Sequence, residues 1–149
     1  MKLSRPLVYL LFASALCAPA LAALGGDVAT VEADRAQLKG TLRVTQPAEY
    51  AVHEISTASG LTVHEYVSAA GKVFAVSWHG AGVPDLHQLL GDYHATLMAA
   101  PRPVYHNHHH YSLETPELVV HSTVILRTSY GRAWVPALMP STVSAAAIN

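Results

Sequence analysis

Three β-rich runs with very short connections constrain the fold of this chain more than any other feature of its sequence. The runs are Tyr50–Thr57, Leu61–Ser68 and Val73–His79. They are joined by Ala58–Gly60 and Ala69–Lys72, and connections of this length join antiparallel neighbours. Gly60 suits the left-handed position of a three-residue hairpin loop. We therefore predict a meander of three antiparallel strands.

The alternation of apolar residues and the loop lengths also predict a register. In the third strand Phe74, Val76 and Trp78 share one face. Their predicted partners in the second strand are Val67, Glu65 and Val63. The same register places His53 opposite Glu65, whereas a slip of one residue would oppose Glu54 to Glu65 and bring like charges together. We therefore expect His53 and Glu65 to form a half-buried polar pair in the sheet.

Helical patterns flank the meander on both sides. After it, apolar residues recur with helical spacing, Pro84 suits a first turn, and Asp85 with Gln88 resembles a capping box. The recurring residues are Leu86, Leu89, Leu90, Tyr93 and Leu97. We predict one long amphipathic helix, ended by Pro101–Pro103. Before the meander, Asp27–Lys39 predicts a short helix with Asp34 on its solvated side.

The rest of the chain predicts two more strands. After a polar loop at His106–Thr115 come the apolar run Leu118–Arg127, a turn at Ser129–Gly131 and a short strand at Arg132–Val135. The tail Pro140–Asn149 is rich in Ala and Ser, and we expect a frayed helical turn there. The predicted fold class is α+β: an antiparallel sheet with the long helix packed on one face and a short N-terminal helix.

The first 22 residues have the layout of a secretory signal peptide. Lys2 and Arg5 precede the apolar run Leu7–Leu16, Pro19 follows it, and Ala20–Ala22 forms a small-residue cleavage site. We predict cleavage after Ala22, a single domain over residues 23–149, and residence in the periplasm or outside the cell. A retained anchor fits less well because the run is shorter than the about 20 apolar residues that span a bilayer.

Removal of this segment changes the chemistry of the chain. Cys17 is the only cysteine, and it is preceded by Leu16, where a lipid-attachment site needs a small residue. The domain that remains therefore has no thiol for catalysis, disulfides or metal binding. It keeps seven basic and ten acidic residues, a formal charge of −3, which argues against nucleic acid as a partner. All ten histidines remain, so its charge should respond strongly to mild acid.

Several short motifs together resemble one known family. They are Ala23–Asp27, Ala33–Arg35, Val52–Glu54, Glu65–Ser68, Val73–Trp78, Pro84–Gly91 with Tyr93, Gly131–Ala133 and Val135–Ala137. This pattern resembles the bacterial exported family catalogued as domain of unknown function 2844. The resemblance implies an exported single domain. It carries over no catalytic or binding residues, and the His106–His110 loop is not part of it.

The histidine-rich loop is the sharpest candidate for a metal site. His106, His108, His109 and His110 could offer two or three imidazole nitrogens to Zn, Cu or Ni. The alternative is a surface loop that binds metal only adventitiously, because no Cys or Asp lies among these histidines and Glu114 is the nearest carboxylate.

Three classes of function follow from these features. The one we favour is a small exported interaction or accessory domain without catalytic residues or a cofactor, whose partner is an envelope or extracellular protein. The second is a periplasmic transition-metal binder that uses the His106–His110 loop. The third is a hydrolase or isomerase in which His53 and Glu65 act as acid and base.

Overall fold

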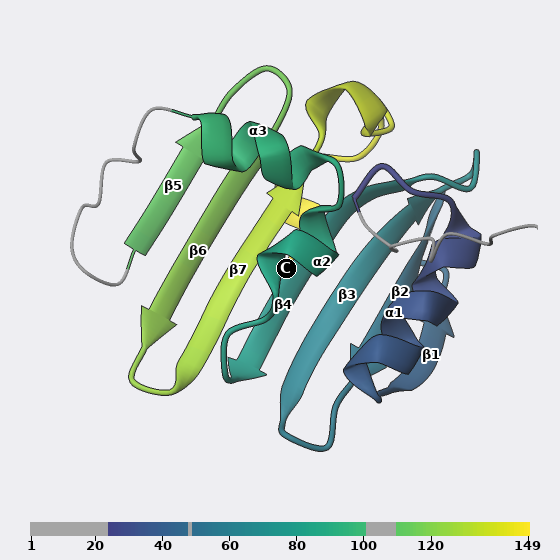
Figure 1. The fold of residues 1–149 in the computed structure, drawn as a ribbon. Coiled ribbons are helices and arrows are strands. Elements are labelled where there is room, and N and C mark those ends of the chain that lie inside the picture. Colours follow the sequence, from purple (N-terminus) through teal and green to yellow (C-terminus); the bar gives the residue numbers. More distant parts are fainter. Residues whose placement is uncertain (1–23, 48, 101–109) are drawn as a thin grey trace, which may run out of the picture.

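A computed structural model describes residues 24–47, 49–100 and 110–149. In these residues seven strands form one antiparallel sheet, in the order β1-β2-β3-β4-β7-β6-β5 (Figure 1). The strands are β1 (Thr41–Thr45), β2 (Tyr50–Ser56), β3 (Leu61–Ser68), β4 (Val73–Ala81), β5 (His110–Glu114), β6 (Val119–Ile125) and β7 (Thr128–Trp134). The helices are α1 (Val31–Leu38), α2 (Leu86–Leu90) and α3 (Tyr93–Ala99), and 3₁₀ turns lie at η1 (Val28–Thr30), η2 (Pro136–Leu138) and η3 (Ala145–Ala147).

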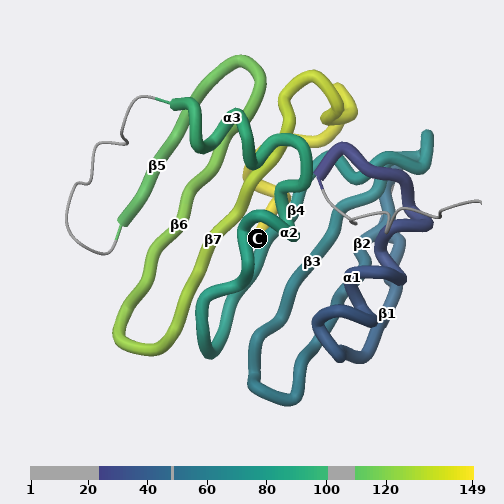
Figure 2. The backbone as a smooth tube through the Cα atoms, in the orientation of Figure 1, coloured from purple at the N-terminus to yellow at the C-terminus, as the bar shows by residue number. Residues whose placement is uncertain are grey.

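The sheet consists of two meanders that meet at β4 and β7. Strands β1 to β4 follow one another in sequence and in space, and so do β5, β6 and β7 (Figure 2). The α+β class and the predicted three-stranded meander, now β2, β3 and β4, are confirmed. Strands β1 and β5 were not predicted, and β5 begins inside the segment that we expected to be a polar loop. Pairing with β2 and β6 supplies the backbone partners that make these two edge segments strands.

The predicted register is confirmed in β2 and β3, and it is wrong at one end of β4. His53 lies opposite Glu65, and Glu65 lies opposite Val76. Val67, however, pairs with Val73 in place of Phe74, because the register shifts between Tyr66 and Val67. Such a bulge turns the following side chains to the other face. Phe74 therefore packs with Tyr66 on the face opposite Val76.

The prediction of one long amphipathic helix is wrong. The segment forms two short helices, because the chain turns at Gly91, which has φ 51° and ψ −127°. Glycine reaches such angles without the steric cost that a Cβ brings. The apolar residues of the predicted helix nevertheless contribute to the core. Leu89 and Leu90 are fully buried against the sheet, and Tyr93 and Leu97 pack against the same cluster.

The start of this helical segment is partly as predicted. Asp85 caps α2, accepting a hydrogen bond from the backbone N–H of His87 at 2.9 Å. Gln88 does not complete a capping box. Its side chain is buried and donates to Asp34 of α1.

The predicted N-terminal helix is present as η1 and α1. It ends at Lys39, which has φ 52°, just before Gly40. The expectation that Asp34 lies on the solvated side is wrong, because only 1% of its surface is exposed. Val31, which precedes it by three residues, is buried on the same side of the helix. The buried stripe of α1 therefore contains an acid.

The last hairpin differs from the prediction in its turn. Ile125 pairs with Thr128, so Leu126 and Arg127 form the turn, and the residues 129–131 expected there lie within β7. Leu126 has φ 57°, in the left-handed region that leucine rarely adopts, so the residue type does not predict a turn there. The tail contains the helical turn η3, as expected, and its Ile148 is fully buried.

The sheet has a core on each face. Helices α1, α2 and α3 cover one face (Figure 1), where the buried cluster includes Val63, Val76 and Leu90. On the other face the tail residue Ile148 packs with Tyr66, Phe74 and Trp134. No helix in the described ranges is both long and apolar enough to cross a membrane. The predicted signal peptide, residues 1–22, lies outside the described residues.

Candidate functional site

The sheet face opposite α1, α2 and α3 carries two polar rows that run across all seven strands. Side chains of directly paired residues point to the same face. The first row is Arg43, Glu54, His64, Ser77, Arg132, His121 and Ser112. The second row is Thr41, Ser56, Thr62, His79, Tyr130, Thr123 and His110. We call this surface the polar face.

The tail packs on an apolar row of the same sheet face, beside the polar face. Beside the two polar rows lies a third row with Val52, Tyr66, Ala75, Trp134 and Val119, and the tail packs on this apolar row. The end of the tail also reaches the first polar row, where Ser77 is buried, whereas His79 and Tyr130 of the second row are exposed.

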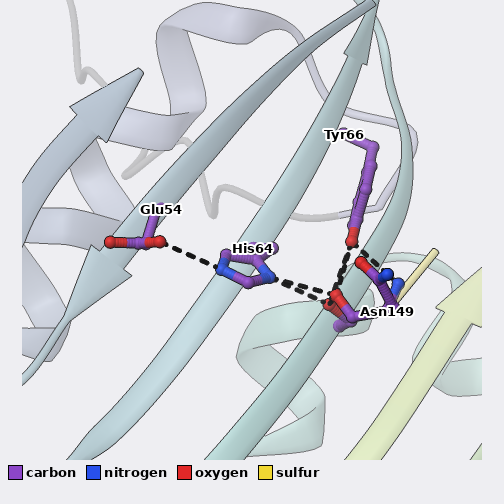
Figure 3. Close-up of polar contacts among 5 residues, drawn as sticks. Glu54, His64, Tyr66 and Asn149 are labelled. Carbon is purple, nitrogen blue, oxygen red and sulfur yellow. Dashed lines mark hydrogen bonds and ion pairs between the residues drawn. The ribbon is translucent and has the colours of Figure 1, made fainter. Parts of the chain in front are cut away.

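The tail is attached to the first polar row through the backbone of Asn149 (Figure 3). The carbonyl oxygen of Asn149 accepts hydrogen bonds from the hydroxyls of Tyr66 at 2.7 Å and Ser77 at 2.9 Å, and it lies 3.1 Å from Nδ1 of His64. The other ring nitrogen of His64 lies 3.3 Å from Glu54 Oε2. A buried or half-buried polar group is stable only with such partners. Side chains of Tyr66, Ser77 and His64 thus surround the main-chain oxygen of Asn149.

Arg132 is held in a fixed position next to this attachment. Its Nη1 donates to the carbonyl oxygens of Ala145 at 3.3 Å and Ile148 at 3.2 Å. Its guanidinium carbon lies 5.5 Å from the centre of the Trp134 ring, a cation–π contact. These contacts order a side chain that would otherwise sample many rotamers.

A hollow of about 530 Å³ lies where the two polar rows cross β4, β7, β6 and β5. Its lining consists of Trp78, His79, His110, His121, Thr123, Tyr130, Gly131, Arg132, Ile148 and Asn149. Three imidazoles, one guanidinium and two hydroxyl groups thus face a single space. This volume is within the range of small-molecule sites, about 300–1,000 Å³.

The register places His53 opposite Glu65, but the polar contacts of Glu65 lie elsewhere. Glu65 and Asp34 are each 1% exposed, and the Gln88 amide donates to Asp34 Oδ1 at 2.7 Å. In the described part of the chain no hydrogen bond joins His53 to Glu65, and the buried Nδ1 of His53 has no partner. The structure thus brings Glu65 together with Asp34 and Gln88 between the sheet and helices α1 and α2.

Burial determines the protonation of this carboxyl pair. It raises the pKa of Glu65 to about 9, and the hydrogen bond to Asp34 and its charge act in the same direction. Burial also raises the pKa of Asp34 to about 6. Both oxygens of Glu65 lack an N–H or O–H donor among the described groups, so a proton on one carboxyl is what lets the two bond. Burial lowers the pKa of His53, which favours its neutral form.

Only one of the four proposed metal ligands can be placed. His106, His108 and His109 lie outside the described residues. His110 is the first residue of β5, its Nδ1 lies 2.8 Å from Thr123 Oγ1, and it lines the hollow. Among described residues no three His, Cys, Asp or Glu side chains lie close enough together to hold a metal ion. Zinc, copper or nickel binding by the loop stays a prediction.

The sequence interpretation did not identify the polar face. A signal for it was present, because polar residues alternate at Thr62 and His64, at Ser77 and His79, and at His121 and Thr123. The assembly of those pairs into one surface depends on the pairing of β4 with β7, which the short loops do not indicate. Asp34 was missed for another reason, since a carboxylate on a helix normally faces water.

A family model described as Protein of unknown function (DUF2844) matches residues 20–148 of this chain. No curated protein and no solved structure is significantly similar to it.

Proposed function

From the premise that this chain belongs to the family described as Protein of unknown function (DUF2844), we propose that it is an exported, non-catalytic interaction domain whose polar face binds its partner. The observation that carries the proposal is the hollow beside Arg132, lined by three histidines and by Tyr130 and Thr123. Such convergent polar groups around a concave space are typical of recognition sites.

Export is supported by the layout of the first 22 residues. The family match begins at residue 20, beside the predicted cleavage after Ala22. The partner we expect is therefore an envelope or extracellular molecule.

The position of the buried acids favours binding over catalysis by His53 and Glu65. A general acid or base must come within hydrogen-bond reach of its substrate. Glu65 is 1% exposed, and the sheet and α2 separate its carboxyl group from solvent. Its raised pKa has a structural explanation in its burial beside Asp34. On the polar face, in contrast, Tyr130 is 50% exposed and can be reached by a partner.

Site-specific photo-cross-linking in cells that export the full chain tests the proposal. A cross-linking residue at Tyr130, which is 50% exposed on the polar face, is compared with one at Met98, which is 68% exposed on α3. We expect one discrete adduct from position 130 and none from position 98, on protein from the envelope or medium that begins at Ala23. Adducts from both positions alike, or none from position 130, would contradict the binding face. An uncleaved cytoplasmic protein would contradict export.

A further inference from the structure

The lining of the hollow on the polar face indicates the chemistry of its ligand. Among the described residues that line it there is no carboxylate side chain, one guanidinium and three imidazoles. Of the neighbouring acids, Glu54 lies 3.3 Å from Nε2 of His64, and Glu114 lies 3.0 Å from Nε2 of His121, which is itself one of the lining imidazoles. The lining of the hollow therefore offers one permanent cation, Arg132, beside imidazole and hydroxyl groups that can form hydrogen bonds.

Within that lining, Arg132 has N–H donors that no described group of the protein uses. Both carbonyl contacts of the guanidinium use Nη1, and no described group accepts a hydrogen bond from Nε or Nη2. These two nitrogens form one edge of the planar fork, and that edge matches the spacing of two oxygens in a carboxylate or phosphate. Because the tail and Trp134 already hold the side chain, little rotamer entropy is lost when an anion binds.

We propose that the hollow binds a small organic ligand through a carboxylate or phosphate group placed against Arg132. The inference rests on the proposed function and names the ligand class of the same site. A space of about 530 Å³ is much larger than a bare anion, so the anionic group belongs to a larger polar molecule. The hydroxyls of Tyr130 and Thr123 and the ring of His79 contact the rest of that molecule.

Three matched sugars separate the possible ligands by charge. Glucose, glucuronate and glucose 6-phosphate share a ring and differ in carrying no anion, a carboxylate or a phosphate. Titration calorimetry on the purified protein is run with each sugar at the same pH. We expect one or both anionic sugars to bind and glucose to bind at least tenfold more weakly.

The matched variants are Arg132→Gln and Arg43→Gln, which remove the same charge from two positions in one row of the polar face. Arg132→Gln is expected to lower affinity at least tenfold, whereas Arg43→Gln, on edge strand β1, is expected to leave it unchanged. Because Arg132 also holds the tail, Tyr130→Phe and His79→Gln serve as second variants that keep those contacts. Each is expected to weaken binding by about threefold to tenfold.

Equal binding of glucose and the anionic sugars, equal loss in both arginine variants, or no binding of either anion would overturn the inference. These failures are distinguishable from failure of the proposed function. If position 130 cross-links but neither anionic sugar binds, the binding face is supported and the anionic ligand class is contradicted. If an anionic sugar binds but position 130 does not cross-link, the ligand class is supported and the macromolecular partner is contradicted.

Discussion

At the scale of single residues, the feature that most affects stability is the buried pair Asp34 and Glu65. The two carboxyl groups share a buried site with the Gln88 amide, and both have raised pKa values. A buried acid is tolerated when it is neutral and hydrogen-bonded, and is costly when charged. The unfolded chain releases the Glu65 proton near its ordinary pKa of 4.5, whereas the folded protein keeps it to about pH 9.

We therefore expect the free energy of unfolding to fall as pH rises from about 4.5 to 9. Its contribution from Glu65 is fully present below the unfolded pKa and is lost as pH approaches the folded pKa, at up to about 1.4 kcal/mol per pH unit. Glu65→Gln removes this titration while its amide can still donate to Asp34. Urea unfolding at several pH values should show a flatter profile and greater stability at pH 8. The exposed Glu117→Gln is the control, and an unchanged slope in Glu65→Gln would contradict the expectation.

At the scale of elements, short connections and special backbone angles decide where helices and strands end. Gly91 divides the segment predicted as one helix into α2 and α3. In β7, Gly131 lets the Trp78 ring lie against the strand, since a Cβ there would come within 2.1 Å of it. Helical spacing alone cannot reveal such breaks, because apolar residues recur at helical intervals across Gly91, from Leu86, Leu89 and Leu90 to Tyr93 and Leu97.

The role of Gly91 can be tested by the sign of one substitution. If the break is required, Gly91→Ala lowers the free energy of unfolding by about 1–3 kcal/mol, because alanine is strained at φ 51° and ψ −127°. If the segment were one continuous helix, the same change would raise stability by about 1 kcal/mol. The denaturation midpoint distinguishes the two. Ala95→Gly, at an exposed position of α3, calibrates helix propensity and should cost about 1 kcal/mol.

At the scale of the whole molecule, the tail completes the second core and borders the candidate site. Ile148 is fully buried against the face opposite the helices, and Asn149 bonds to Tyr66 and Ser77. The same segment holds Arg132 through two carbonyl groups. Stability and the geometry of the hollow therefore depend on the same contacts.

Ile148→Ala should show this dependence. Truncation of a fully buried isoleucine is expected to cost about 2–5 kcal/mol in the free energy of unfolding. Val44→Ala, which shortens a side chain that is 53% exposed on β1, is expected to stay within about 0.5 kcal/mol of the unchanged protein. Chemical denaturation measures both. Similar small effects for the two variants would mean that the tail does not pack on the sheet in solution.

By itself the sequence determined the meander of β2, β3 and β4 and the opposition of His53 to Glu65, because alternation and loop length act between neighbours in the chain. Only the tertiary structure decided what those residues contact. Asp34 meets Glu65 because α1 packs on the sheet, and the polar face forms because β4 pairs with β7. These contacts join distant segments, and their energies depend on burial, which no local pattern contains. The histidines on β4, β5 and β6 likewise share one hollow only after the two meanders join.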